Sequence, residues 1–266
     1  MFRVIRSLYE YLVLYIGLLY FAIAGMAFTV LCAVLYLLLP RKVGVWFGRN
    51  AIGLLFRSYL AMLRATGLVK LDLSAFDDLR GEKGLIVAPN HPSLLDAVFV
   101  ISRLPDIACI MKADIRDSLV LGGGARLAGY IRNDTAGNMV REAARELRSG
   151  QQLLVFPEGT RTRSEPVNAF KGGFALIAKQ AGAPLQTVFI ETDNPFLGKG
   201  WPILKKPPLP LVYRARLGER FEVSGSVKVF VSKFESYYRN ELMAKHAPPA
   251  SASTEQTAVG NSATAS

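Results

Sequence analysis

The longest apolar run of the chain lies near its N-terminus, where residues 11–39 contain no charged side chain. A helix needs about 20 apolar residues to cross the hydrocarbon core of a bilayer. The run therefore predicts a membrane anchor, either a single tilted span or a shallow re-entrant hairpin, because it is too short for two full spans. A secretory signal peptide is disfavoured, since the charged sequence Pro40-Arg41-Lys42 follows instead of a small-residue cleavage site.

Residues 43–68 carry apolar side chains at the spacing of a second helix. Arg49, Arg57 and Arg64 recur at intervals that keep them on one face of such a helix. A basic amphipathic helix after a membrane segment can lie in the headgroup layer, and this is the position we expect. The alternative is an ordinary core-facing helix with a solvated basic side. In either case residues 1–68 form the membrane anchor and amphipathic helix.

From Val69 onward, short apolar runs alternate with stretches of helical periodicity, which is typical of a mainly parallel sheet. The predicted strands are 84–88, 107–111, 152–156 and 185–191, with one or two more in 211–223 interrupted at Gly218. The predicted helices are 92–103, 136–148 and 172–181, with a weaker helical pattern in 227–245. The order predicts an α/β fold whose mixed, mainly parallel sheet is flanked by helices and preceded by the transmembrane or re-entrant anchor.

Two segments lack periodicity. Residues 201–210 are rich in proline and are predicted to be a loop. Residues 247–266 consist mainly of Ala, Ser, Thr and other small or polar residues, so we expect a disordered tail. The remaining domain then covers residues 69–246.

The net charge of +11 suggests an anionic partner, and the apolar N-terminus favours membrane phospholipid or a phosphorylated substrate. Nucleic acid is disfavoured because the basic residues are not interleaved with a recognisable reading motif. Five basic residues follow the apolar run as far as Arg64, against two before it. The positive-inside rule therefore places the domain on the cytoplasmic face of the cell inner membrane.

Metal and disulfide chemistry have little support in the sequence. Cys32 and Cys109 are too few and too far apart for a disulfide framework or a zinc cluster, and we interpret both as packing residues. His91 has no second histidine near it in the sequence, so no metal site is expected.

The chain has only two histidines, and His91 opens the string Asn-His-Pro-Ser-Leu-Leu-Asp directly after a predicted strand. A general base that works near neutral pH is most often a histidine. Asp96 is the natural orienting partner, although five residues along a regular helix leave two side chains about 140° apart. The pair can meet if His91 sits at the helix cap, outside helical geometry. The alternative is a capping histidine and an exposed helical aspartate.

A second polar string, Phe-Pro-Glu-Gly-Thr-Arg at 156–161, again follows an apolar strand. The guanidinium group of an arginine can donate two parallel hydrogen bonds to phosphate oxygens, so Arg161 is a candidate anion-binding residue. Lys171 precedes a predicted helix whose free N–H groups could add to such a site. The alternative is a solvated basic loop.

The two strings together resemble the glycerolipid acyltransferase family, whose best-known members are the 1-acyl-glycerol-3-phosphate acyltransferases. The resemblance covers roughly residues 70–220. It implies acyl transfer from acyl-CoA or acyl-acyl carrier protein to a lysophospholipid hydroxyl, most simply giving phosphatidic acid, with no metal or bound cofactor. His91 would be the general base and Asp96 its orienting partner. The residues matching the family's acceptor-binding motif are Glu158, Gly159, Thr160 and Arg161, with Lys171 as a plausible helper.

Two departures from the family pattern concern the acceptor. The intervening family motif ends in an arginine. Here either Arg132 stands one place early, which would reverse its direction along a strand, or the aligned place is Asn133. Arg132 is still a candidate residue for binding the acceptor. The last family motif has two prolines, and Thr187 replaces the second. The acceptor therefore stays open between 1-acyl-glycerol-3-phosphate and another molecule, such as an aryl-polyene or other glycolipid.

Two other classes of function remain as alternatives. A non-catalytic membrane protein that binds anionic lipid would explain the charge and the anchor, but it gives no reason for a histidine beside an aspartate. A hydrolase with Ser93 as nucleophile would lack the usual Gly-x-Ser-x-Gly elbow. The sequence leaves the acyl chain length and the oligomeric state undetermined.

Overall fold

The structure is a computed structural model that describes residues 2–116, 118, 122–133, 135–164 and 166–246. The predicted disordered tail, 247–266, lies outside the described residues.

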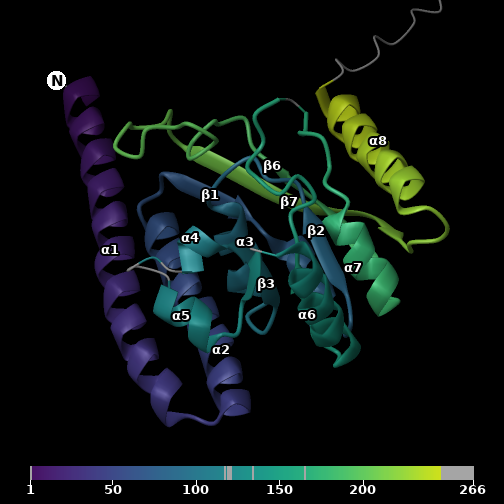
Figure 1. Cartoon of the computed structure of the whole chain (residues 1–266). Coiled ribbons are helices and arrows are strands. Elements are labelled where there is room, and N and C mark those ends of the chain that lie inside the picture. Colours follow the sequence, from purple (N-terminus) through teal and green to yellow (C-terminus); the bar gives the residue numbers. More distant parts are fainter. Residues whose placement is uncertain (1, 117, 119–121, 134, 165, 247–266) are drawn as a thin grey trace, which may run out of the picture.

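The apolar N-terminal run forms part of one continuous helix, α1 (Phe2–Leu38). At 37 residues it is about 55 Å long. By length and composition it is the one helix among the described residues that could cross a membrane. The chain reverses at Pro40, and α2 (Arg41–Ala65) returns along α1 (Figure 1). The predicted re-entrant hairpin within the run is therefore wrong, because the reversal comes after the run and not inside it.

The second helix packs one face against the core, while Arg57 and Arg64 on its other face remain exposed, so its expected place in the headgroup layer stays a prediction. It packs against α1, against α3 (Asp96–Arg103) and against α5 (Gly122–Leu127). Arg49, predicted on a basic exposed face, is only 2% exposed. Its guanidinium lies 2.9 Å from Glu146 Oε2 and donates to the carbonyl of Ala128. The helix periodicity was predicted correctly, but the burial of Arg49 depends on a carboxylate nearly a hundred residues away.

Seven strands form one sheet in the order β1-β7-β6-β2-β5-β3-β4. The pairs are parallel except β6 and β7, which run antiparallel, so the predicted mixed, mainly parallel sheet is confirmed. The segment 211–223 forms one strand, 211–221, and its pairing with β6 shifts register at residues 218–219, where the interruption was predicted. The strands are β1 (Val69–Asp72), β2 (Ile86–Pro89), β3 (Ala108–Lys112), β4 (Ile131–Asn133), β5 (Leu153–Leu154), β6 (Leu185–Glu191) and β7 (Leu211–Phe221).

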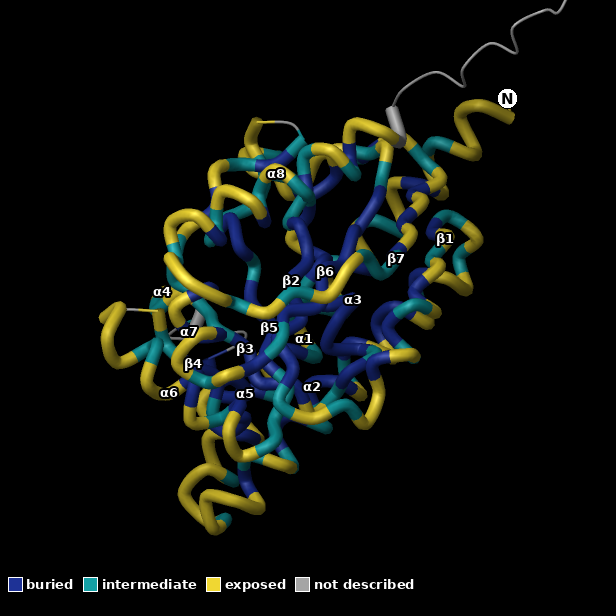
Figure 2. Tube along the Cα trace, turned by 90° about the vertical axis from the view of Figure 1, so that its right-hand side faces the viewer, coloured by how far each residue is buried: buried dark blue, intermediate teal, exposed yellow. Residues whose placement is uncertain are grey.

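Helices cover both faces of the sheet. Alternate strand residues divide between two cores, with Val87 and Leu154 facing α2, α3 and α5, and with Ile86 and Leu153 facing the opposite helices. Figure 2 shows the strands as the most deeply buried part of the chain. The remaining helices are the 3₁₀ helix η1 (Ser74–Leu79), α4 (Ala113–Arg116), α6 (Ala136–Arg148), α7 (Gly173–Ala181) and α8 (Val227–His246).

The topology brings the two polar strings together. Strands β2 and β5 are parallel neighbours, with Ile86 opposite Leu153 and Val87 opposite Leu154. The segments that leave their carboxyl ends therefore emerge at the same edge of the sheet. In α/β proteins ligands bind at this edge.

Candidate active site

The His91 and Asp96 side chains are in contact. His91 Nδ1 lies 2.8 Å from Asp96 Oδ2, and the N–H of Ser93 donates to the same oxygen at 2.8 Å. The predicted helix 92–103 begins only at Asp96, because residues 92–95 form turns. This correction explains the contact, since the turns fold the imidazole back over the start of the helix.

The surroundings of this pair hold the imidazole in one orientation. Asp96 is fully buried, and loss of hydration raises the pKa of its carboxyl, against the opposing effects of His91, the Ser93 N–H and Arg161. The His91 ring stacks on Phe156, with centroids 3.8 Å apart and planes 16° apart. Because Nδ1 is engaged with Asp96, Nε2 is the nitrogen left for a substrate.

Glu158 fixes the backbone of His91 and does not face the cavity described below. Its carboxylate is completely buried and accepts hydrogen bonds from the N–H of His91 at 2.9 Å and the N–H of Asn168 at 2.8 Å. It also accepts from the Thr162 hydroxyl at 2.8 Å. Burial raises the pKa of Glu158 despite these hydrogen bonds. The structure therefore shows that the Glu158 side chain connects its own segment, 156–161, to the backbone of His91 by a hydrogen bond, which corrects its predicted role in acceptor binding.

Gly159 occupies a position that only glycine fits easily. Its φ is +66°, and a Cβ atom there would lie 2.9 Å from Lys171 Cδ. The backbone can thus pass close to the Lys171 side chain. Both residues, together with Thr160, line the cavity.

Arg161 also lines the cavity, but part of its guanidinium is used within the protein. Its NH1 group donates to the carbonyl oxygens of Leu197 at 2.8 Å and Gly198 at 3.0 Å. Arg161 thereby connects the segment that follows β6 to the segment 156–161 by hydrogen bonds, and its positive charge also acts on Asp96.

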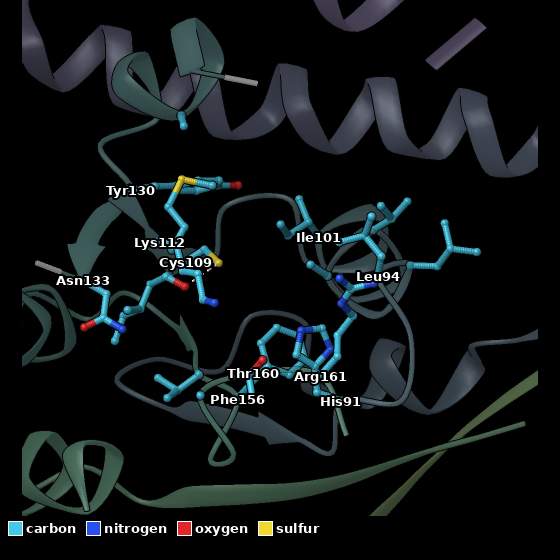
Figure 3. A pocket seen from close by; sticks show the side chains of 18 of the residues that line it. His91, Leu94, Ile101, Cys109, Lys112, Tyr130, Asn133, Phe156, Thr160 and Arg161 are labelled. Atoms are coloured by element: carbon cyan, nitrogen blue, oxygen red, sulfur yellow. Dashed lines mark hydrogen bonds between the residues drawn. The ribbon is translucent and has the colours of Figure 1, made fainter. Parts of the chain in front are cut away.

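A cavity of about 550 Å³ extends from His91 into the interior between the sheet and the N-terminal helices. Figure 3 shows His91, Phe156 and Arg161 at one end, with Cys109 and Tyr130 farther along it. Its lining is mostly apolar, including Phe21 and Phe28 of α1, Ile52 and Phe56 of α2, Val98 and Ile101 of α3, and Ala125 of α5. The size and lining suit a hydrocarbon chain.

The polar part of the lining is cationic. It contains Lys112, Arg161, Lys171 and Lys199, and no Asp or Glu belongs to the described residues that line the cavity. The neighbouring Arg163 lowers the pKa of Lys199 most, and desolvation, Lys112 and Arg161 lower it further. This uncompensated charge favours an anionic ligand group.

The sequence analysis did not single out several residues of the site, and one residue that it named as a candidate does not line the cavity. Arg132 does not belong to the described lining, whereas the next residue, Asn133, does. Phe156, which stacks on His91, and Lys112, at the end of β3, were not singled out. The signal for Lys112 was its position directly after a buried apolar strand, at the edge of the sheet where ligands bind.

The geometry argues against Ser93 as a nucleophile. Its side chain is 1% exposed, and its hydroxyl donates to the carbonyl of Phe196 and accepts from the N–H of Leu95. Both cysteines are free and buried, as predicted. Within the described ranges, no three His, Cys, Asp or Glu side chains gather where they could hold a metal ion.

A buried carboxylate orients a histidine next to an apolar cavity with cationic side chains, and this arrangement suits proton transfer on a ligand that has both an apolar and an anionic part. A family model described as Acyltransferase matches residues 70–191. Over this segment, which contains both polar strings, the chain is similar to acyltransferases.

The chain is similar to enzymes that act on two kinds of lipid. It is 31% identical over 121 residues to the lyso-ornithine lipid O-acyltransferase of Pseudomonas aeruginosa, covering 41% of this chain and 46% of that protein. It is 26% identical over 174 residues to the 1-acyl-sn-glycerol-3-phosphate acyltransferase of Limnanthes douglasii, covering 63% and 62% of the two chains. The chain thus spans about half to three fifths of the length of these relatives.

The fold also resembles a solved structure, the 1-acyl-sn-glycerophosphate acyltransferase PlsC from Thermotoga maritima. The TM-score is 0.67 at 22% identity, and the match covers 92% of this chain and 98% of that one. At this identity the likeness shows the fold alone.

Proposed function

We propose that the protein transfers an acyl group from a thioester, acyl-CoA or acyl-acyl carrier protein, to the free hydroxyl of 1-acyl-glycerol-3-phosphate, giving phosphatidic acid. The observation that carries this proposal is the 2.8 Å contact between His91 Nδ1 and Asp96 Oδ2 at the end of an apolar cavity. A binding protein would have no need of an oriented base at that place.

In the proposed reaction, His91 Nε2 takes the proton of the acceptor hydroxyl as its oxygen attacks the thioester carbonyl carbon. Asp96 holds the imidazole in the tautomer with the proton on Nδ1 and stabilises the imidazolium that forms. When the carbon–sulfur bond breaks, the thiolate takes the proton back from His91. The products are an ester and a free thiol, and the scheme uses no metal or bound cofactor.

The charge around the cavity supports a phosphate-bearing acceptor. A phosphomonoester is close to dianionic at neutral pH and suits the group formed by Lys112, Arg161, Lys171 and Lys199. An ornithine headgroup carries an ammonium group as well as a carboxylate, and the described lining offers the ammonium group no carboxylate partner. This difference favours 1-acyl-glycerol-3-phosphate over the acceptor named for the Pseudomonas relative.

The exposed apolar face of α1 supports attachment to a membrane. It includes Leu8, Leu12, Leu19 and Ile23, which are all more than half exposed. The folded domain contacts α1 near both of its ends, because Lys206 pairs with Glu10 and Gly123 packs against Thr29. A helix that crossed the bilayer, with the domain on one side, could not keep both contacts. We therefore place α1 along the membrane surface.

Basic residues next to the helix are attracted to the anionic cytoplasmic leaflet, so we place the domain on the cytoplasmic face of the inner membrane. The acyl donors occur on that side.

The test uses the purified full-length protein in mixed micelles with acyl-CoA or acyl-acyl carrier protein, and release of free thiol is measured. We expect turnover with 1-acyl-glycerol-3-phosphate, much less with lyso-ornithine lipid, and a loss of about 10³-fold or more in His91→Ala. The thermal melt of the variant serves as the folding control. Near-normal turnover by a folded His91→Ala variant refutes the mechanism, and faster turnover with lyso-ornithine lipid refutes the acceptor.

A further inference from the structure

A short basic segment outside the catalytic strings presents apolar side chains to solvent. Residues 198–206, which we call the 198–206 loop, read Gly-Lys-Gly-Trp-Pro-Ile-Leu-Lys-Lys and contain no acidic residue. Ile203 and Leu204 are 54% and 62% exposed at its tip. The proposed reaction scheme assigns no role to these two side chains.

The exposure of the tip is built into the loop. The N–H of Trp201 donates to the carbonyl of Gly198 at 3.2 Å, and the N–H of Lys205 donates to that of Pro202 at 2.9 Å. The Trp201 indole N–H donates to the carbonyl of Lys205 at 3.1 Å, and Lys205 Nζ lies 4.9 Å from the indole centroid. This closed turn holds the apolar tip outward.

The loop joins the active site to the N-terminal helix. Gly198, at its beginning, accepts a hydrogen bond from Arg161. Lys206, at its end, lies 2.6 Å from Glu10 Oε2 and 4.8 Å from the Tyr11 ring centroid of α1. In Figure 1 this green segment reaches across to the N-terminal half of α1.

The cavity reaches both of these elements. Leu18 of α1 and Ile203 of the loop both line it, and Ile203 is more than half exposed. Each element therefore contributes an apolar side chain to the cavity wall, and Ile203 extends from that wall to the outer surface.

We propose that the tip of the 198–206 loop inserts into an anionic phospholipid bilayer beside α1 and forms one side of a lateral entrance for the lipid acceptor. Trp, Lys and aliphatic side chains together are typical of segments that lie at the membrane interface. Lys205 adds an exposed positive charge next to the tip, and Leu8 and Leu12 of α1, the helix that the loop contacts, are also more than half exposed. The entrance for the acceptor rests on the proposed function, but insertion of the tip does not.

The first experiment reports on insertion without requiring activity. Trp46 and Trp201 are the two tryptophans of the chain, so Trp46→Phe leaves Trp201 as a single probe. The full-length variant is reconstituted with vesicles of phosphatidylethanolamine and phosphatidylglycerol, with and without bromine on the acyl chains. Quenching of Trp201 by the brominated lipid is expected. Equal emission in both kinds of vesicle overturns the proposal.

The second experiment separates delivery of the acceptor from chemistry. Leu204→Asp puts a charge on the tip, and Val229→Asp puts the same charge on α8, at a residue that is 68% exposed and far from α1 (Figure 1). We expect Leu204→Asp to lower kcat/KM about tenfold for a vesicle-embedded acceptor. The rate with a dissolved short-chain acceptor should stay unchanged, and Val229→Asp should change neither rate.

Equal losses with both acceptor forms, or no loss with either, overturn the lateral entrance. If the wild-type protein transfers no acyl group to any acceptor, the proposed function fails, while quenching of Trp201 still decides whether the tip inserts.

Discussion

Replacing Glu158 decides between a residue that binds the acceptor and a residue that positions the base. The resemblance to the family implies the first role, whereas the structure places the carboxylate, fully buried, on the backbone of His91. We predict that Glu158→Gln and Glu158→Ala weaken the fold and the chemical step, and leave binding of the acceptor almost unchanged.

The magnitude follows from the hydrogen bonds. Glu158 Oε1 accepts the N–H of His91, and Oε2 accepts the N–H of Asn168. A glutamine has one oxygen, so one of these donors loses its acceptor, at about 1–3 kcal/mol. An alanine leaves both donors unpaired, at about 2–6 kcal/mol. For a domain of this size the glutamine variant should lose about 2–12 °C in Tm. The lower end is expected, because the substitution also removes a buried charge whose pKa is raised.

The assay compares Tm and steady-state kinetics in the same detergent, with the exposed Glu142→Gln on α6 as a matched control. A displaced His91 should lower kcat about ten- to a hundredfold. The KM for the acceptor should stay near that of the wild type. An unchanged Tm and kcat together with a raised acceptor KM would show that Glu158 contacts the acceptor, and would refute this reasoning.

Three further predictions concern the oriented pair, the anchor and the cavity. Asp96→Asn should lower kcat about 10³- to 10⁴-fold, because the imidazole loses the partner that fixes its tautomer. Burial raises the Asp96 pKa above 3.8, so ionisation of this carboxyl destabilises the folded state as pH rises. The Tm of Asp96→Asn should therefore equal that of the wild type below about pH 3.8 and be higher than that of the wild type above this pH. Arg49→Ala should cost about 3–5 kcal/mol of unfolding free energy, since it leaves Glu146 without its buried cation, and denaturant titration measures this loss. Ala125→Leu should shift the preference toward shorter acyl chains in a competition assay, because it adds three carbons to the cavity lining; an unchanged preference would place the acyl chain elsewhere.

Local patterns predicted the elements of the fold well. Period-two and period-3.6 apolar spacing located β2, β3, β5 and β6 and the helices α6, α7 and α8, since each of these buries one face or both. Short elements with little periodicity of their own were missed. They are β1, η1, the four-residue helix α4, the glycine-rich α5 and the three-residue strand β4.

Charged residues showed the limit of local patterns most clearly. The spacing of Arg49 predicted an exposed basic face, but the structure buries it against Glu146. Periodicity reports which residues share a helix face, and it does not report which partner from another part of the chain will cover that face.

The sequence by itself determined the chemistry that the site can perform, because the single histidine outside the C-terminal region, its aspartate and the apolar anchor are all visible in the order of residues. Only the tertiary structure decided how these residues are used. It turned Glu158 inward onto His91, bound Arg161 to the 198–206 loop, and placed Lys112 and Lys199 at one cavity. These roles depend on contacts between strands and loops far apart along the chain, and such contacts exist only once the parallel sheet brings the carboxyl ends of β2, β5 and β3 side by side.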